Sequence, residues 1–213
     1  MDTLEVLVKA RGLLAKPESW IQGGLSETAA GDPVPIEDER AVCFCLDGAL
    51  MVASGTVMVP DAYLALGFPN VADVWDWNDD DERTHAEVLA RLDEAIAKLR
   101  TDKEEVMETL EIIRKTRALI ATPETWTTQA GARDHDGAPV SWDAPEVACR
   151  CLYIAVATAA RSCIGEERVA EALGFLRSAD IAPWNDAPGR THAEVLARID
   201  EATARLQARK GAH

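Results

Sequence analysis

The sequence predicts a mainly α-helical protein of two homologous helical modules, each with a small β-hairpin or long loop, related by a pseudo-two-fold axis. Two observations lead to this prediction. The chain repeats itself at an offset of 106 to 107 residues, and its most similar segments have the periodicity of amphipathic helices. Because two similar modules on one chain usually pack through equivalent faces, as in a C2 dimer, we expect an intramolecular pseudo-dimer.

The last helix of each half shows the duplication most directly. Residues 84–99 read THAEVLARLDEAIAKL and residues 191–206 read THAEVLARIDEATARL, with 13 of 16 positions identical. Other matched pairs are Pro17-Glu18-x-Trp20 with Pro123-Glu124-x-Trp126, Cys43-x-Cys45 with Cys149-x-Cys151, and Trp77-Asn78-Asp79 with Trp184-Asn185-Asp186. We therefore divide the chain into a first module, 1–101, and a second, 102–213. The change of offset places one short insertion or deletion between Leu46 and Leu66.

The first helix of each module is predicted from its apolar stripe. Apolar residues recur at helical spacing from Thr3 to about Ala15, and Pro17 ends the helix. The equivalent helix of the second module begins at a capping box formed by Thr101 and Glu104. The two modules are thus expected to meet at a break between two helices.

The middle of each module is predicted from composition. Residues 20–36 are rich in Gly, Ser, Thr and Pro, which indicates either an irregular hairpin that turns at residues 30–32 or a plain loop. Residues 41–53, matched by 147–160, are apolar nearly all round and predict a buried central helix. Short helices are expected at 61–68 and 167–175.

The end of each module is the best-specified element. The Trp-Asn-Asp segment leads into a final helix, for which Thr84 is the N-cap and Glu87 completes a capping box. Apolar side chains at helical spacing form its buried stripe, namely Val88, Leu89, Leu92, Ile96 and Leu99.

Composition restricts the classes of partner. The net charge is −15, and residues 1–100 carry 8 Lys and Arg against 19 Asp and Glu, or −11. Such a chain should be repelled by nucleic acid and by anionic membranes, and should attract a basic partner. No stretch reaches the roughly 20 apolar residues of a membrane helix, and the N-terminus is not of the signal-peptide type. A cytoplasmic protein, monomeric or a small homo-oligomer, is expected.

Five cysteines lie in apolar stretches, at positions 43, 45, 149, 151 and 163. We interpret them as reduced core residues. Two alternatives are a zinc site made by the two Cys-x-Cys pairs, and a reactive thiol at Cys45 or Cys151 with His85 or His192 as its base.

The repeated Trp-Asn-Asp segments, each followed by an Arg and a His, are the main candidate site. An Asx turn closed by an Arg–Asp pair and anchored by Trp is a sufficient structural account. The functional alternative is a polar pocket or partner surface that is presented twice. Its candidate residues are Trp77, Asn78, Asp79, Arg83 and His85 in the first module, and Trp184, Asn185, Asp186, Arg190 and His192 in the second.

A metal-binding alternative concerns the first module alone. Asp76, Asn78, Asp80 and Glu87 fall at positions 1, 3, 5 and 12 of an EF-hand frame, which suggests Ca²⁺ or Mg²⁺. Asp81, however, stands where the frame requires Gly, and an Asn/Asp turn before a helix N-terminus also explains these acids. No cofactor is expected.

Several of these motifs together resemble a known type of domain. They are Trp20, Gly31-x-Pro33, Cys45-Leu46-x-Gly48-Ala49, and Trp77-Asn78-Asp79 followed by Arg83-Thr84-x-x-Glu87-Val88. Each module resembles an uncharacterised domain of bacteria and phages, catalogued as a domain of unknown function. The resemblance implies a tandem pair and a bacterial or phage origin, and it brings no activity. The second module departs from the pattern at Cys151-Leu152-Tyr153-Ile154-Ala155, where the Gly-Ala pair is lost, so a role that depends on Gly48 does not carry over to it.

We expect a non-catalytic binding or regulatory protein whose acidic first module meets a basic protein, or whose surface holds a small ligand. Neutralising Asp76 and residues 79–82 should then abolish binding and spare folding. Two alternatives are an enzyme of unfamiliar type, built on Cys45 and Cys151 or on the Asn-Asp-Arg set, and a structural protein that forms oligomers.

Overall fold

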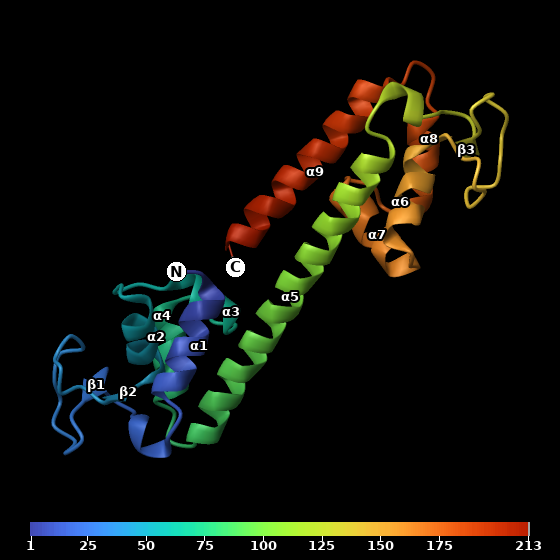
Figure 1. Ribbon diagram of the computed structural model, residues 1–213. Helices are drawn as coiled ribbons and strands as arrows, with labels where there is room; N and C mark the ends of the chain where they lie inside the picture. The colour runs from blue at the N-terminus through green and yellow to red at the C-terminus, as the bar shows by residue number, and fades with distance from the viewer. Residues whose placement is uncertain (213) are drawn as a thin grey trace. The chain divides into compact units, whose positions relative to one another are not determined.

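The chain folds as two small helical modules, each with a short antiparallel hairpin (Figure 1). The computed structural model describes the backbone of residues 1–212 and the side chains of residues 1–209. Helices account for 57% of the chain, which confirms the predicted mainly α class. The two compact units are Met1–Lys103 and Glu104–Gly211. The pseudo-two-fold relation between them stays a prediction.

Each module follows the same order of elements. The first contains α1 (Thr3–Leu13), β1 (Ser26–Glu27), β2 (Cys43–Phe44), α2 (Leu46–Ser54), α3 (Pro60–Ala65), α4 (Val71–Asn78) and the start of α5 (His85–Leu119). The second contains the end of α5, β3 (Ala132–Arg133), β4 (Cys149–Arg150), α6 (Leu152–Ala160), α7 (Cys163–Ala172), α8 (Ile181–Asn185) and α9 (His192–Ala212). Single 3₁₀ turns occupy Pro17–Ser19, Pro123–Thr125 and Ser178–Asp180.

Helix α5 corrects the predicted break between the modules. It runs without interruption through residues 101–104, where a capping box was expected. The Thr101 hydroxyl donates a hydrogen bond to the Ala97 carbonyl, which is the arrangement of a Thr inside a helix. No Gly or Pro lies between the two helical patterns, so they merge into one helix. The predicted start is confirmed, because the Glu87 carboxylate accepts hydrogen bonds from the N–H and the hydroxyl of Thr84, both at 2.8 Å.

The predicted central helix at residues 41–53 is wrong in its first half. Cys43 and Phe44 form strand β2, and Cys45 is extended (φ −71°, ψ 174°) before α2 begins. β2 pairs with β1, Ser26 opposite Phe44, so hydrogen bonding to a distant segment overrides the local apolar pattern. The turn predicted at residues 30–32 is present, with Glu27 bridged to Pro33, but the main pairing lies outside the predicted 20–36 hairpin.

Two further differences lie between the central helix and the last one. Helix α4 was not predicted, because it is only eight residues long and it ends in the Trp-Asn pair, which was interpreted as part of an Asx turn. The predicted short helices at 61–68 and 167–175 begin earlier in the structure, as α3 and α7. The predicted insertion lies in the segment that holds the loop and α3 or α7, since the C-caps Gly55 and Arg161 are 106 residues apart and the C-caps Leu66 and Leu173 are 107 apart.

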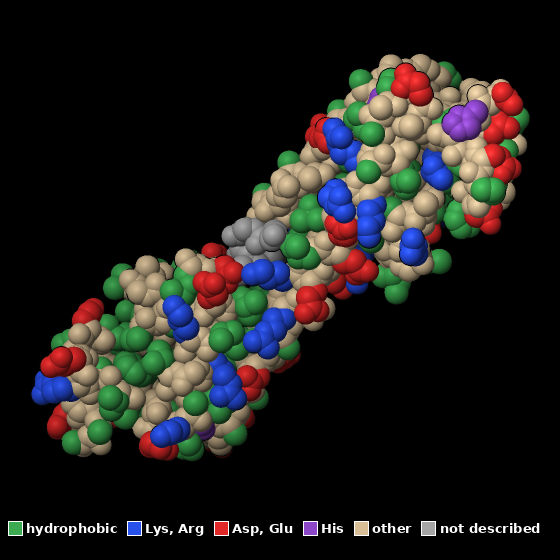
Figure 2. Space-filling model, in the orientation of Figure 1, with side chains coloured by type: hydrophobic (Ala, Val, Ile, Leu, Met, Phe, Trp, Pro, Cys, Tyr) green, Lys and Arg blue, Asp and Glu red, His purple; other side chains and the backbone are tan. Residues whose placement is uncertain are grey.

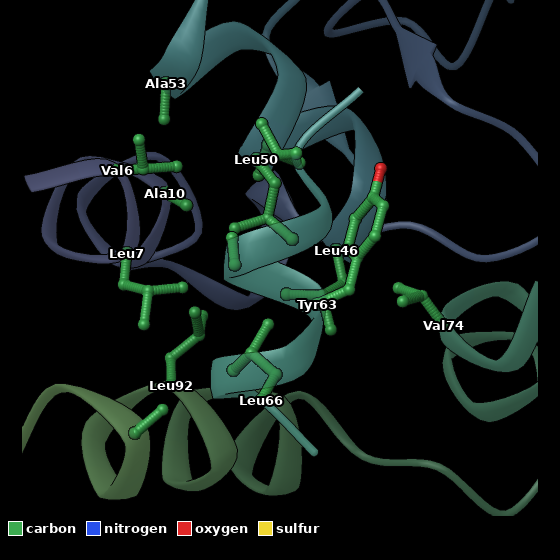
Figure 3. Close-up of a cluster of buried hydrophobic side chains, with 14 of the residues drawn as sticks. Val6, Leu7, Ala10, Leu46, Leu50, Ala53, Tyr63, Leu66, Val74 and Leu92 are labelled. Carbon is green, nitrogen blue, oxygen red and sulfur yellow. The ribbon is translucent and has the colours of Figure 1, made fainter. Parts of the chain in front are cut away.

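The core of the first module is built by helices α1, α3, α4 and α5 packed around α2. Figure 3 shows buried side chains of α1, α2, α4 and α5 pointing toward one another, among them Leu7, Leu46, Leu50, Val74 and Leu92. Four of the five predicted stripe residues of the last helix are buried, and Leu89 is half-buried. The second module repeats this core with Ile113, Leu152, Val156, Ile181 and Ile199.

The charges are mixed over the visible surface. In Figure 2 acidic and basic side chains are interspersed on both modules, so the negative net charge does not form one continuous face in that view. Among the described residues, no helix has both the length and the apolar composition needed to cross a membrane.

Candidate functional site

Asn78, the last residue of α4, is a fully bonded and buried amide. Its side-chain oxygen accepts hydrogen bonds from the Trp20 indole N–H (2.8 Å) and the Leu46 backbone N–H (3.1 Å). Its Nδ2 donates to the Ile21 carbonyl (3.2 Å) and to the Asp79 carboxylate (2.7 Å). All four hydrogen-bonding positions of the amide are thereby used. Asn78 ties the loop after α1 and the N-terminus of α2 to the end of α4.

Asn185 makes the same four contacts in the second module. Its oxygen accepts from the Trp126 indole N–H (2.8 Å) and the Leu152 N–H (3.2 Å). Its Nδ2 donates to the Thr127 carbonyl (3.1 Å) and to Asp186 (2.8 Å). Because both amides are buried and fully bonded, they cannot bind a ligand without breaking the fold.

The arginine of each motif packs on the tryptophan ring and does not pair with the aspartate that follows Asn78 or Asn185. Arg83 lies 4.1 Å from the Trp77 ring centroid and donates from Nε to the Trp77 carbonyl at 3.0 Å. Arg91, from α5, lies over the same ring at 5.1 Å. Arg190 and Arg198 repeat the arrangement on Trp184, at 4.0 and 4.6 Å. These cation–π contacts attach the last helix to the end of the preceding one.

The histidines join the first turn of each module's last helix to the C-terminal end of its first helix. The Nε2 of His85 lies 2.7 Å from the Leu14 carbonyl oxygen, which accepts its hydrogen bond, and the ring packs near Trp20 at 6.3 Å. His192 does the same with Ile120 at 2.8 Å and Trp126 at 5.8 Å. The structure therefore brings the predicted site residues together in each module. We call this set the Trp-Asn-Arg-His framework; it consists of Trp77, Asn78, Arg83 and His85 in the first module and of Trp184, Asn185, Arg190 and His192 in the second.

The acids that follow this framework divide into two kinds. The Asp79 carboxylate accepts a hydrogen bond from the Gly23 N–H at 3.0 Å, and its counterpart Asp186 accepts one from Gln129 at 2.9 Å, so both are part of the fold. The exposed acids of residues 80–82 have no counterpart, because Ala, Pro and Gly stand at 187–189.

The structure does not arrange the EF-hand candidates as a calcium loop. Asp76 and Asn78 lie on helix α4 instead of in a loop, and the Asn78 oxygen is already occupied. The Glu87 carboxylate is bonded to Thr84 and lies 3.3 Å from the Arg83 guanidinium. Over the described residues, no group of three or more His, Cys, Asp or Glu side chains is placed to hold a metal ion.

The cysteines have three different environments. Cys45 and Cys151 are buried N-caps, and the Cys45 sulfur accepts a hydrogen bond from the Gly48 N–H at 3.3 Å. Burial raises the pKa of the Cys45 thiol to about 11, and it raises that of Cys151 as well. A protonated, buried thiol is a poor nucleophile. Cys43 and Cys149 are half-buried in strands β2 and β4, and Cys163 is exposed, which corrects its assignment to the core.

One polar cluster escaped the sequence interpretation. The buried Asp47 carboxylate accepts hydrogen bonds from the Tyr63 hydroxyl (2.6 Å) and the Trp75 indole N–H (2.8 Å). The second module has Tyr153, Ala170 and Ala182 at these three positions, so the whole cluster is missing there. The replacement of Asp47 by Tyr in the repeat was the available signal.

Comparison with protein families accounts for nearly all of the chain. The model of a family of unknown function, DUF6197, matches residues 1–98 and again residues 105–205. Searches of the curated proteins and of the solved structures gave no match. The two matched segments correspond to the two modules, each with its complete Trp-Asn-Arg-His framework. The chain therefore belongs to the DUF6197 family, as a tandem pair of its domains.

Proposed function

We propose that the protein is a non-catalytic binding protein whose first module contacts a basic protein through an acidic segment, defined as Asp76 together with residues 79–82. The observation that supports this most strongly is the contrast between the two repeats. The framework residues, which are needed for folding, are present in both modules, whereas the acids at 80–82 occur in one. Asp80 accepts a hydrogen bond from the Glu82 N–H at 2.9 Å and lies 4.0 Å from Arg83; both contacts are local, and the second module has no equivalent of them. Exposed, charged side chains that join no other element are candidates for contacts with another molecule.

The backbone of the acidic segment is held in place by a residue that is also specific to the first module. The Gln22 side-chain amide donates to the carbonyls of Asn78 and Asp80, both at 2.8 Å. Thr128 replaces Gln22 in the second module. A fixed backbone presents its side chains with a smaller loss of entropy on binding, which favours recognition of a partner.

The chemistry of the framework supports the non-catalytic part of the proposal. Catalysis by Cys45 would require a thiolate, and burial raises the pKa of this thiol to about 11. The proposed base, His85, hydrogen-bonds to the Leu14 carbonyl instead. The Asn-Asp-Arg set is likewise used to join helices and loops.

Affinity capture with two matched variants tests the proposal. The first variant changes Asp76, Asp80 and Asp81 to Asn and Glu82 to Gln. Asp79 is kept because its carboxylate supports the loop at Gly23. The control variant removes the same number of exposed charges elsewhere in the first module, by amide substitution of Asp32, Glu37, Glu39 and Glu94.

We expect basic proteins to be retained by the immobilised wild-type chain and by the control, and to be lost from the first variant. Retention should also fall as the salt concentration rises, because exposed charge pairs are screened. Equal retention by both variants, or retained proteins that are not basic, would contradict the proposal.

A further inference from the structure

A groove of about 620 Å³ lies in the second module between α5 and the C-terminal end of α6. Its volume falls within the range of small-molecule sites, about 300–1,000 Å³. Aliphatic side chains line part of it, including Ile112 and Leu119 from α5 and Ala159 and Ala160 from α6. These surfaces suit an apolar chain.

Most of the charges around the groove are neutralised within the module. Glu111 pairs with Arg114 at 2.8 Å and with Lys115 at 3.4 Å. Glu108 pairs with Arg168 at 2.8 Å. Arg161 also lines the groove, and it makes no ion pair with any side chain that the structure describes. One cation is therefore left for an external anion.

The backbone of Arg161 has a conformation for which the first module has a glycine at the counterpart position. Arg161 ends α6 in the left-handed region, with φ 57° and ψ 13°. At the equivalent position the first module has Gly55, with φ 73°. Glycine adopts this conformation freely, and a residue with a side chain is strained there. Such strain at a polar residue motivates a search for function.

We propose that this groove binds a small aliphatic monocarboxylate, with its chain against Ile112, Leu119, Ala159 and Ala160 and its carboxylate on Arg161. A guanidinium presents paired N–H donors that match the two oxygens of a carboxylate. One unpaired guanidinium beside a partly aliphatic groove matches a ligand with one charge and one apolar chain. This inference concerns the second module and is independent of the proposed partner of the first.

Calorimetric titration of the full chain tests it, with octanoate as the probe and 1-octanol as the uncharged probe of equal chain length. The key variant is Arg161→Gly, which removes the guanidinium and introduces the residue that the first module has at this position. This variant should fold at least as well as the wild type, since it relieves the positive φ. The control is Arg114→Gln, which removes a cation that is already paired with Glu111.

We expect octanoate to bind the wild type and the Arg114→Gln variant, and to bind Arg161→Gly at least tenfold more weakly. 1-Octanol should bind the wild type more weakly than octanoate, and equally to the wild type and Arg161→Gly. Undetectable octanoate binding at millimolar concentration would overturn the proposal. Unchanged affinity in Arg161→Gly, or octanol binding as tight as that of octanoate, would overturn it equally.

Discussion

Gly48 in α2 faces the carbonyl oxygen of Leu25 so closely that a Cβ at this position would overlap it. In the second module the glycine of this close contact lies on the other segment. Ile154 stands at the position of Gly48, and Gly131 stands at the position of Leu25. A Cβ on Gly131 would in turn meet the Ile154 side chain at 3.1 Å. The small residue has thus changed sides between the two repeats.

Gly48→Ala should therefore destabilise the first module by about 1–3 kcal/mol, the usual range for overpacking a tight contact. Chemical denaturation of the full chain measures this. Gly12→Ala in α1 is the matched control and should not lower stability, because a Cβ at that position meets no atom within 4 Å and Ala is the better helix former. Equal stability of Gly48→Ala and the wild type would show that the Leu25 segment moves freely.

Asn78→Ala should cost about 2–4 kcal/mol, because it leaves the Trp20 indole N–H and the Leu46 N–H without their acceptor. Asn185→Ala should have a similar effect on the second module. Chemical denaturation measures the loss of unfolding free energy, and faster hydrogen exchange at the Leu46 amide shows that the loss arises at this contact. A free energy of unfolding within 0.5 kcal/mol (roughly the effect of a typical surface substitution) of the wild-type value would contradict the structural role of these amides.

Thr116→Ala should stabilise the chain by about 1 kcal/mol. The Thr116 hydroxyl is buried and has no hydrogen-bond partner among the described atoms. Removing an unsatisfied hydroxyl from the interior is favourable, and Ala is also the better helix former. The first module has Ala10 at this position. Thr109→Ala is the control, because that hydroxyl donates to the Glu105 carbonyl, and it should bring no comparable gain.

Thiol labelling of the native chain should modify Cys163 first and leave Cys45 and Cys151 unmodified until the protein unfolds. Cys163 is exposed, and burial raises the pKa of the other two thiols. Mass spectrometry after a timed reaction gives the order. Rapid labelling of Cys45 at neutral pH would revive the enzyme hypothesis.

The capping boxes should make the free energy of unfolding decrease at acidic pH. Hydrogen bonds from the backbone N–H of Thr84 and Thr191 lower the pKa of Glu87 and Glu194. Since these carboxylates are more acidic in the folded chain than in the unfolded one, their contribution is present at neutral pH. It is lost as the pH falls below about 4.3, the ordinary value for Glu, toward the folded pKa.

Replacing Glu87 and Glu194 by Gln should flatten the fall in stability between about pH 5 and pH 3. Denaturation at a series of pH values measures the slope. Glu94→Gln, which changes an exposed acid on the same helix, should leave the slope nearly unchanged. Identical slopes in the double variant and the wild type would argue against the capping role.

The sequence was sufficient to predict the helices whose apolar pattern or N-cap lies within their own residues. The duplication, the helix at Thr3 and the capping box at Thr84 depend on local patterns, and each is present in the structure. The strand at Cys43 and the short helix α4 depend on pairing and packing with segments far along the chain. Local composition cannot indicate such contacts.

The residues of the candidate site were predicted correctly, but the partner of its arginine was not. Trp, Asn, Arg and His do come together in each module, but Arg83 contacts Trp77 and Glu87 rather than Asp79. The Asp47–Tyr63–Trp75 cluster joins residues from three helices, so no single stretch of sequence reveals it. A position-by-position comparison of the two repeats distinguishes the framework residues, which both modules share, from residues such as Asp47 that occur in one module.

The central claim is that the acids at 76 and 80–82 serve a contact and not the fold. The free energy of unfolding of the variant with Asn at 76, 80 and 81 and Gln at 82 tests it most directly. We predict a value within about 0.5 kcal/mol of the wild type, or slightly higher because like charges are relieved. A loss of about 2 kcal/mol or more, in the range of a disrupted buried contact, would contradict the claim and make these acids part of the framework.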